Sequence, residues 1–173
     1  MSNSQMVNGD AKAMLRLTDK QAAEYFHRSY TAVDGLWFLK VEERLGFDSA
    51  LDIDDDVWKV LPKIQARLLR SILKTEKGIS ALLETLTTKL DLEGFEFRAE
   101  KRKYGFDILV TGCPWHNLMI RSGRFELSEK VGSLICNTEN SVWASEFGDD
   151  ITFELKGQIC KGGEHCLLKF REG

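Results

Sequence analysis

The sequence has little proline, no long apolar run and no excess of positive charge. Only Pro62 and Pro114 occur among its 173 residues, which leaves long stretches free to form helices. No apolar run reaches the length of about 18 residues that a transmembrane helix needs, so we expect no membrane partner. The net charge of −3 offers no basic surface for nucleic acid, and we expect none as a partner.

The first residues also lack the pattern of an export signal. Residues 1–13 are mostly polar, and no basic stretch there is followed by an apolar core. We therefore expect a cytoplasmic protein, in which thiols stay reduced and disulfides are rare. With 43% hydrophobic and 29% charged residues, the chain has the composition of an ordinary globular protein and is long enough to bury its own core.

Hydrophobic periodicity predicts a flexible arm over residues 1–16 and a single α+β domain over 17–173. Thr18 and Gln21 have the spacing of a capping box, after which a helix is predicted to about Leu45. Further helices are predicted over 48–73 and 79–90. Because Pro62 lies inside the second of these, that helix is expected to start or bend there.

From Gly94 the period changes from that of a helix to strict alternation. Strands are predicted over 95–100 and 104–110, and again over 151–155 and 166–170. The stretch 115–147 between them is mainly helical, with breaks expected at 123–125 and near Asn137. We expect helices packed on one face of a four-stranded antiparallel sheet, in the order ααα-ββ-α(α)-ββ.

All four cysteines lie in the sheet half of the chain, beside two of the three histidines. Zinc prefers thiolate and imidazole ligands, and iron–sulfur clusters also accept thiolates. The sequence therefore predicts a site for zinc or iron, with His165 as a substitute ligand. The predicted ligands are Cys113, His116, Cys136, Cys160 and Cys166.

The same residues allow other interpretations. Cysteine is among the residues most often buried, so the thiols are equally explained as reduced core groups, and redox pairing is a third interpretation. A sharper hypothesis makes Cys113 a catalytic nucleophile. It precedes a predicted helix and has His116 nearby, and a helix N-terminus and an imidazolium both lower a thiol pKa.

A second candidate site lies on the long first helix. His27, Tyr30 and Asp34 lie at the border of its apolar stripe, and we predict that they line a pocket for a small-molecule ligand. The alternative is a border histidine beside a solvated or backbone-bonded aspartate.

Three parts of the sequence resemble a family of small cytosolic proteins of anaerobic bacteria and archaea. They are the helix Tyr25–Glu43, the segment Cys113–Trp115, and Cys136 with Trp143 and Phe147–Gly148. That family is uncharacterised and is grouped with L-2-amino-thiazoline-4-carboxylic acid hydrolase-like proteins. The element order is also similar to the 4-vinyl-reductase-like domain and to transport-particle subunits. This resemblance implies a cavity for a small or acyl-type molecule, in some members with a cysteine-held metal.

Two functions follow as expectations, and whether the protein is an enzyme stays open. The first is a metal- or small-ligand-binding domain with a sensor or accessory role, as a monomer or a homodimer. The second is a hydrolase of a small cyclic amide-like or thiazoline substrate, which uses Cys113 as nucleophile or a metal-bound water of lowered pKa. A third interpretation, a protein-interaction module, predicts scattered thiols and a large exposed apolar patch.

Overall fold

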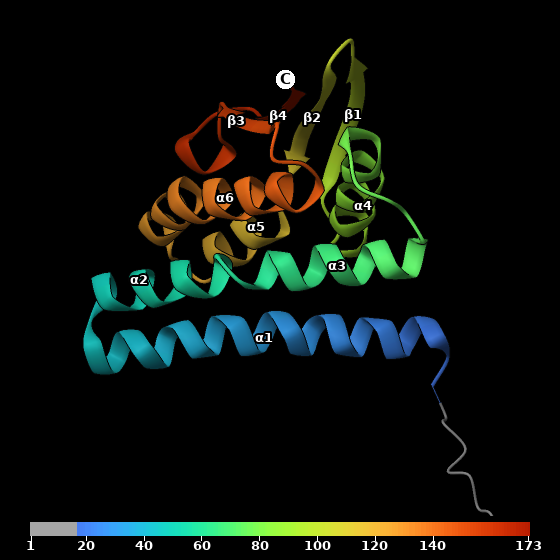
Figure 1. Cartoon of the computed structure of the whole chain (residues 1–173). Coiled ribbons are helices and arrows are strands. Elements are labelled where there is room, and N and C mark those ends of the chain that lie inside the picture. Colours follow the sequence, from blue (N-terminus) through green and yellow to red (C-terminus); the bar gives the residue numbers. More distant parts are fainter. Residues whose placement is uncertain (1–16) are drawn as a thin grey trace, which may run out of the picture. The chain divides into compact units, whose positions relative to one another are not determined.

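The structure is a computed structural model that describes residues 17–173 (Figure 1). The arm predicted over 1–16 lies outside the described residues. The chain divides into two compact units, one up to Trp37 and one from Phe38 to Gly173. Within the described residues no helix has both the length and the apolar character needed to span a membrane.

The first unit consists of the larger, N-terminal part of helix α1 (Asp19–Leu45). The predicted capping box is confirmed. The Gln21 amide donates to the Thr18 hydroxyl oxygen at 3.2 Å, and the Gln21 side-chain oxygen accepts from the Thr18 amide at 2.9 Å. These two bonds satisfy backbone donors that the first turn of a helix leaves unpaired, and so they fix the start of α1.

The second unit begins with the end of α1 and three further helices. These are α2 (Phe47–Trp58), α3 (Leu61–Leu73) and α4 (Ile79–Leu92). The helix predicted over 48–73 is thus divided at residues 59–60, with Pro62 in the first turn of α3, where its missing N–H is harmless. Gly46 alone connects α1 to α2, at a φ of 85° that favours glycine.

The remaining elements form the predicted antiparallel sheet and its helices. The strands are β1 (Glu96–Arg102), β2 (Gly105–Gly112), β3 (Ile151–Lys156) and β4 (Cys166–Glu172). Helices α5 (Pro114–Arg121) and α6 (Phe125–Phe147) follow β2, and a 3₁₀ turn η1 (Ile159–Lys161) follows β3. The α+β class is therefore confirmed, and residues 17–94 form four helices where three were predicted.

The break predicted near Asn137 is wrong, whereas the one at 123–125 is confirmed by the residues between α5 and α6. Helix α6 continues through Asn137 because the side-chain amide of this residue donates to the Ser133 carbonyl, one turn earlier, at 2.7 Å. The asparagine thus satisfies its polar atoms on its own helix instead of interrupting it.

The core lies between the sheet and the helices α4 and α6 (Figure 1). Alternation along the two central strands turns Phe106 and Ile108 of β2 and Phe170 of β4 toward this core, where each is almost fully buried. The rings of Phe106 and Phe170 stack at 4.8 Å. Side chains of this size contribute about 1.5–3 kcal/mol each when buried, so the central strands supply much of the stability.

The order of the strands decides which chain segments meet. The sheet runs β1-β2-β4-β3, so the last strand in the sequence lies between β2 and β3. Val110 near the end of β2 pairs with Cys166 at the start of β4, and Lys156 at the end of β3 pairs with Leu167. The segments that leave β2 and β3 and the segment that enters β4 are therefore at one end of the sheet.

Candidate functional site

The four cysteines come from four different elements around that end of the sheet. Cys113 is the N-cap of α5 directly after β2, and Cys166 begins β4. Cys160 lies in η1 after β3, and Cys136 lies in the middle of α6. All four are free thiols in partly buried residues. The arrangement agrees with the placement at strand ends that the sequence indicated for most of them.

Helix α6 contributes a row of small residues at intervals of four, Ser128, Gly132 and Cys136, which lie on one face of the helix. The Ser128 hydroxyl is 2.7 Å from Nδ1 of His116 on α5. One turn further along, the carbonyl of Gly132 accepts a 2.6 Å hydrogen bond from the Gln158 side chain. The row therefore connects α6 both to α5 and to the segment that carries Cys160.

Two of the thiols accept hydrogen bonds from the backbone. The His116 amide donates to Cys113 Sγ at 3.4 Å, and the Ile159 amide donates to Cys166 Sγ at 3.3 Å. The first bond is the helix-capping contact of α5, with a sulfur in the role that a hydroxyl or carboxylate usually takes. The two sulfurs thus have fixed positions at the ends of β2 and β4.

The electrostatic environment opposes ionisation of every thiol. Burial, together with Cys166 and Cys160, raises the pKa of Cys113 to about 11, although two backbone amides act in the opposite direction. Burial and the Glu139 carboxylate raise the pKa of Cys136, and each of the other three cysteines raises it further. The four thiols are therefore close enough to influence one another and remain protonated at neutral pH.

The thiols do not form a preformed metal centre. In the part of the chain from residue 17 to 173, no group of three or more histidine, cysteine, aspartate or glutamate side chains has the arrangement that holds a metal ion. The raised pKa of Cys113 also differs from the lowered value that an activated nucleophile needs. What the structure brings together is a cluster of neutral soft donors, with acidic groups beside it.

The predicted histidines differ in their surroundings. His116 contacts both Cys113 and Ser128, as described above. His165 is partly exposed and lies in the turn directly before Cys166. His27, Tyr30 and Asp34 are partly exposed on the first-unit part of α1, where the His27 carbonyl accepts from the Thr31 hydroxyl at 3.2 Å. A ligand pocket at these three residues stays a prediction.

A buried ion cluster lies next to Cys136. The Lys89 ammonium, in α4, is in contact with Glu139 of α6 and is 3.0 Å from Glu93. Burial lowers the pKa of Lys89, but the two carboxylates outweigh burial and hold it above its ordinary value. Burial raises the pKa of Glu139, and Glu93 adds to that effect, against the attraction of Lys89. Glu139 lies three residues after Cys136, on the same side of α6.

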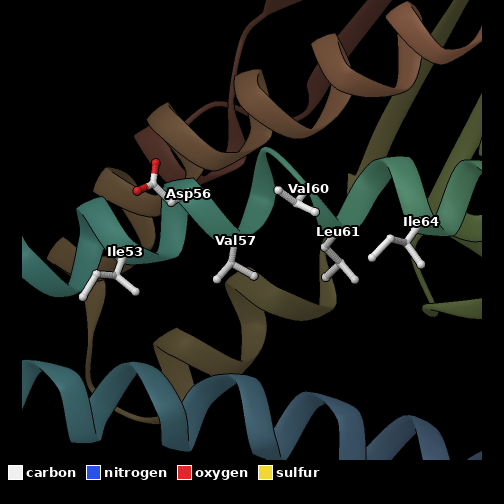
Figure 2. A pocket seen from close by; sticks show the side chains of 6 residues that line it. All are labelled: Ile53, Asp56, Val57, Val60, Leu61 and Ile64. Atoms are coloured by element: carbon white, nitrogen blue, oxygen red, sulfur yellow. The ribbon is translucent and has the colours of Figure 1, made fainter.

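An apolar hollow lies over α2 and the start of α3 (Figure 2). Its lining is aliphatic except for one acidic side chain. The lining residues are Ile53, Asp56, Val57, Val60, Leu61 and Ile64. The lining of the hollow includes neither a cysteine nor a histidine. The hollow and the thiol cluster are therefore formed by different residues with different chemistry.

Sequence reasoning missed three contributors to the thiol region: Ser128, Gly132 and Glu139. Ser128 and Gly132 could have been found in the sequence, because small residues occur at every fourth position there and the third of them is Cys136. Glu139 had no comparable signal, since its partner Lys89 is 50 residues away in the sequence.

Residues 15–109 match a family of unknown function, DUF6125. The match covers the four N-terminal helices and most of the first hairpin, and it ends before Cys113. No curated protein matches the chain.

Proposed function

The chain belongs to the DUF6125 family, and we propose that this member binds a zinc or iron ion through its four cysteine thiols. Cys113, Cys136, Cys160 and Cys166 are the ligands, and His116 and His165 are substitutes. The protein acts in the cytoplasm as a sensor or accessory domain. The observation that carries the proposal is the convergence of four cysteines from α5, α6, η1 and β4 around one end of the sheet.

The chemistry of the donors supports this function. Soft thiolates select zinc and iron over magnesium and calcium, and four of them complete a tetrahedral shell. At Cys136 the local charge also favours a cation, because the Glu139 carboxylate raises the pKa of that thiol. At Cys160 the charges of Lys161 and Glu129 act in opposite directions. A bound cation would reverse the mutual repulsion of the thiolates.

Metal binding requires the thiol side chains to turn toward one point, since the described residues hold no preformed centre. Cys113 is the N-cap of α5 and Cys160 lies in the 3₁₀ turn η1, so a change of χ1 would move the first sulfur away from the His116 amide and the second away from Gly132. When bound, the ion would fix α5, α6, η1 and β4 to one another, and ligand binding would add directly to the stability of the fold.

The hydrolase alternative receives less support. A cysteine hydrolase needs a thiolate at neutral pH, whereas burial raises the pKa of Cys113 to about 11. A metal-bound water would need an open coordination position, and four thiolates close the shell. A small-molecule ligand at His27, Tyr30 and Asp34 remains compatible with the metal function, because those residues belong to the other unit.

The test is a metal analysis of the full chain, purified anaerobically, followed by titration of the metal-free protein with Co²⁺. We expect about one ion per chain and the strong visible bands of tetrahedral cobalt thiolate. Cys136→Ser and Cys166→Ser should each remove most of the absorbance. Ser145→Ala, an exposed position on the same helix as Cys136, is the matched control and should bind like the wild type.

A protein that contains no stoichiometric metal and gives no cobalt thiolate spectrum would overturn the proposal. So would a spectrum that survives all four single cysteine substitutions. Loss of the signal with His116→Ala but not with Cys160→Ser would keep a metal site and change its ligand set.

A further inference from the structure

Strand β1 forms one edge of the sheet, and among the described residues no strand lies on its outer side (Figure 1). All of its residues are exposed except Phe97, which is partly buried. An edge strand presents a row of unpaired N–H and C=O groups that another strand can join. Charged side chains protect most such edges, so the arrangement of the charges on β1 decides whether it can accept a partner.

The charges of β1 are arranged as a palindrome. Every second residue along one face of the strand is charged, in the order Glu96, Arg98, Glu100 and Arg102. In an antiparallel pair of two β1 strands centred on Ala99, Arg98 lies opposite Glu100 of the other copy, and Glu96 lies opposite its Arg102. Each charge then faces an opposite charge, which stabilises a strand pair, whereas like charges directly opposite one another destabilise it.

The same pattern opposes the neighbouring registers. A shift by two residues in one direction places Glu96 opposite Glu100, and Arg98 opposite the same residue of the other copy. A shift in the other direction places Arg98 opposite Arg102, and Glu100 opposite the same residue of the other copy. A parallel pair in register places every residue opposite itself. Like charges meet in all three arrangements, so the charges of β1 select one antiparallel register.

Contacts within the chain leave these charges available to a partner. Arg98 is exposed and forms no ion pair within residues 17–173. The Glu100 carboxylate is 2.6 Å from the Arg102 guanidinium, and its side chain is still 63% exposed. Arg102 is in turn 2.7 Å from Asp107 of β2, which holds the guanidinium along the face of the sheet. The central charges of β1 are therefore ordered and accessible.

We propose that two copies of the chain join edge to edge through β1, about a two-fold axis at Ala99, so that their sheets become one continuous sheet. Main-chain hydrogen bonds between the strands supply the affinity, and the charge pairs select the partner and the register. The partner is a second copy because the charge order of β1 is complementary to itself, as a two-fold contact requires. The contact uses residues of the second unit alone and none of the proposed metal ligands, so the two proposals can fail separately.

The test begins with the mass of the full chain by sedimentation velocity and light scattering, where we expect a dimer. Arg98→Glu and Glu100→Arg each turn both central charge pairs of the dimer into like-charge pairs. Each should weaken the dimer by about tenfold to a hundredfold. Circular dichroism should show an unchanged fold, because both side chains are exposed. Arg121→Glu, an exposed reversal of charge at the end of α5, is the matched control and should stay dimeric.

Combining the substitutions tests the charge pairing itself. The double variant R98E/E100R exchanges the two charges within each strand and should restore the dimer. A mixture of the two single variants should also dimerise, because every central charge then faces an opposite one across the axis. A monomeric wild type overturns the proposal, and so does a dimer that withstands both single substitutions. It is also overturned if neither the double variant nor the mixture dimerises.

A thiol on the axis measures the register independently. Ala99→Cys brings two introduced thiols together, since residues directly opposite in a strand pair have neighbouring Cβ atoms. A short bismaleimide should therefore link two chains through residue 99, which mass spectrometry of the linked peptide detects. The wild type, with alanine at this position, is the control. A dimeric A99C variant that is not linked at residue 99 would overturn the edge-to-edge arrangement.

Discussion

The sulfur of Cys160 lies against the backbone of α6 at Gly132, in the space that a side chain at residue 132 would occupy. A Cβ on Gly132 would overlap the sulfur and would lie 3.2 Å from the Cβ of Cys160. The Gln158 side chain joins the same two segments, because it donates a 2.6 Å hydrogen bond to the Gly132 carbonyl. The absence of a side chain at residue 132 thus allows η1 to lie directly on α6.

Gly132→Ala should displace η1 and with it the Cys160 thiol. We expect a loss of about 1–3 kcal/mol in the free energy of unfolding, because the added methyl group overpacks a closed contact. Metal affinity should fall as well, since one ligand is moved. Urea denaturation and Co²⁺ titration measure the two effects. Gly35→Ala, where a Cβ meets open space, should instead stabilise α1 by about 1 kcal/mol. Equal changes in unfolding free energy and in Co²⁺ affinity for Gly132→Ala and Gly35→Ala would contradict this prediction.

Cys113 should react slowly with iodoacetamide at neutral pH. Burial raises its pKa to about 11, so only about one thiol in 10,000 is ionised at pH 7, and the rate should rise tenfold per pH unit through the alkaline range. Mass spectrometry of the peptide that contains Cys113 measures the rate. An S145C variant supplies an exposed reference thiol. Alkylation of Cys113 at pH 7 as fast as that reference would restore the nucleophile hypothesis.

Lys89→Met should be among the most damaging substitutions in the chain. It leaves the Glu93 and Glu139 carboxylates buried without their shared cation, and removing one partner of a buried ion cluster costs about 3–5 kcal/mol. Thermal or urea unfolding measures the loss. Lys156→Met removes an exposed lysine whose pair with Glu154 spans 3.2 Å, and it should cost no more than about 1 kcal/mol.

The loss in Lys89→Met should also depend on pH. The pKa of Glu139 is already raised in the folded protein, chiefly by burial, and removing the lysine raises it further. When the pKa of a carboxyl group is higher in the folded state than in the unfolded state, the group stabilises the folded state at pH values below its unfolded-state pKa. This stabilisation is lost as the pH rises through the folded-state pKa. The variant should therefore be closer to the wild type at about pH 5 than at about pH 8. If the difference in unfolding free energy between the variant and the wild type did not change with pH, the buried carboxylates would not be the cause of the lost stability.

Asp107→Asn should weaken, in a pH-dependent way, the ion pairs that join β2 to β1 and β4. Burial opposes ionisation of Asp107, but hydrogen bonds from Arg171 at 2.6 Å and Arg102 at 2.7 Å hold its pKa below the ordinary value. We expect a loss of about 1–3 kcal/mol at neutral pH. Because the native contribution disappears as the pH falls through the lowered pKa, the difference from the wild type should narrow toward about pH 3. Glu154→Gln, on an exposed strand position, should show neither effect.

The fold class could be predicted from the sequence because its signals are local. The capping box at Thr18, the alternation from Gly94 onward and the position of Pro62 each depend on neighbouring residues only. The sheet order could not be predicted in this way. Whether β4 pairs with β2, β3 or both depends on which faces the helices cover, and the alternation of β4 is compatible with each arrangement.

The candidate site also has features that could be predicted from the sequence and features that could not. The placement of Cys113, Cys160 and Cys166 at element ends was visible in the sequence, whereas the burial that raises their pKa values is a product of packing. Lys89 illustrates the limit. In the sequence it is the single lysine of the amphipathic helix α4, and only the crossing of α4 and α6 makes it the buried partner of Glu139.

The position of β4 in the sheet has a consequence for the synthesis of the protein. β4 follows the other three strands in the sequence, yet in the sheet of the described residues it lies between β2 and β3, which do not pair with each other. Until residues 166–172 leave the ribosome, β2 has an open edge and β3 has no strand beside it, so each exposes unpaired backbone groups. The two halves of the sheet therefore join only after residues 166–172 have been synthesised, and Cys166 arrives with them as the last of the four thiols.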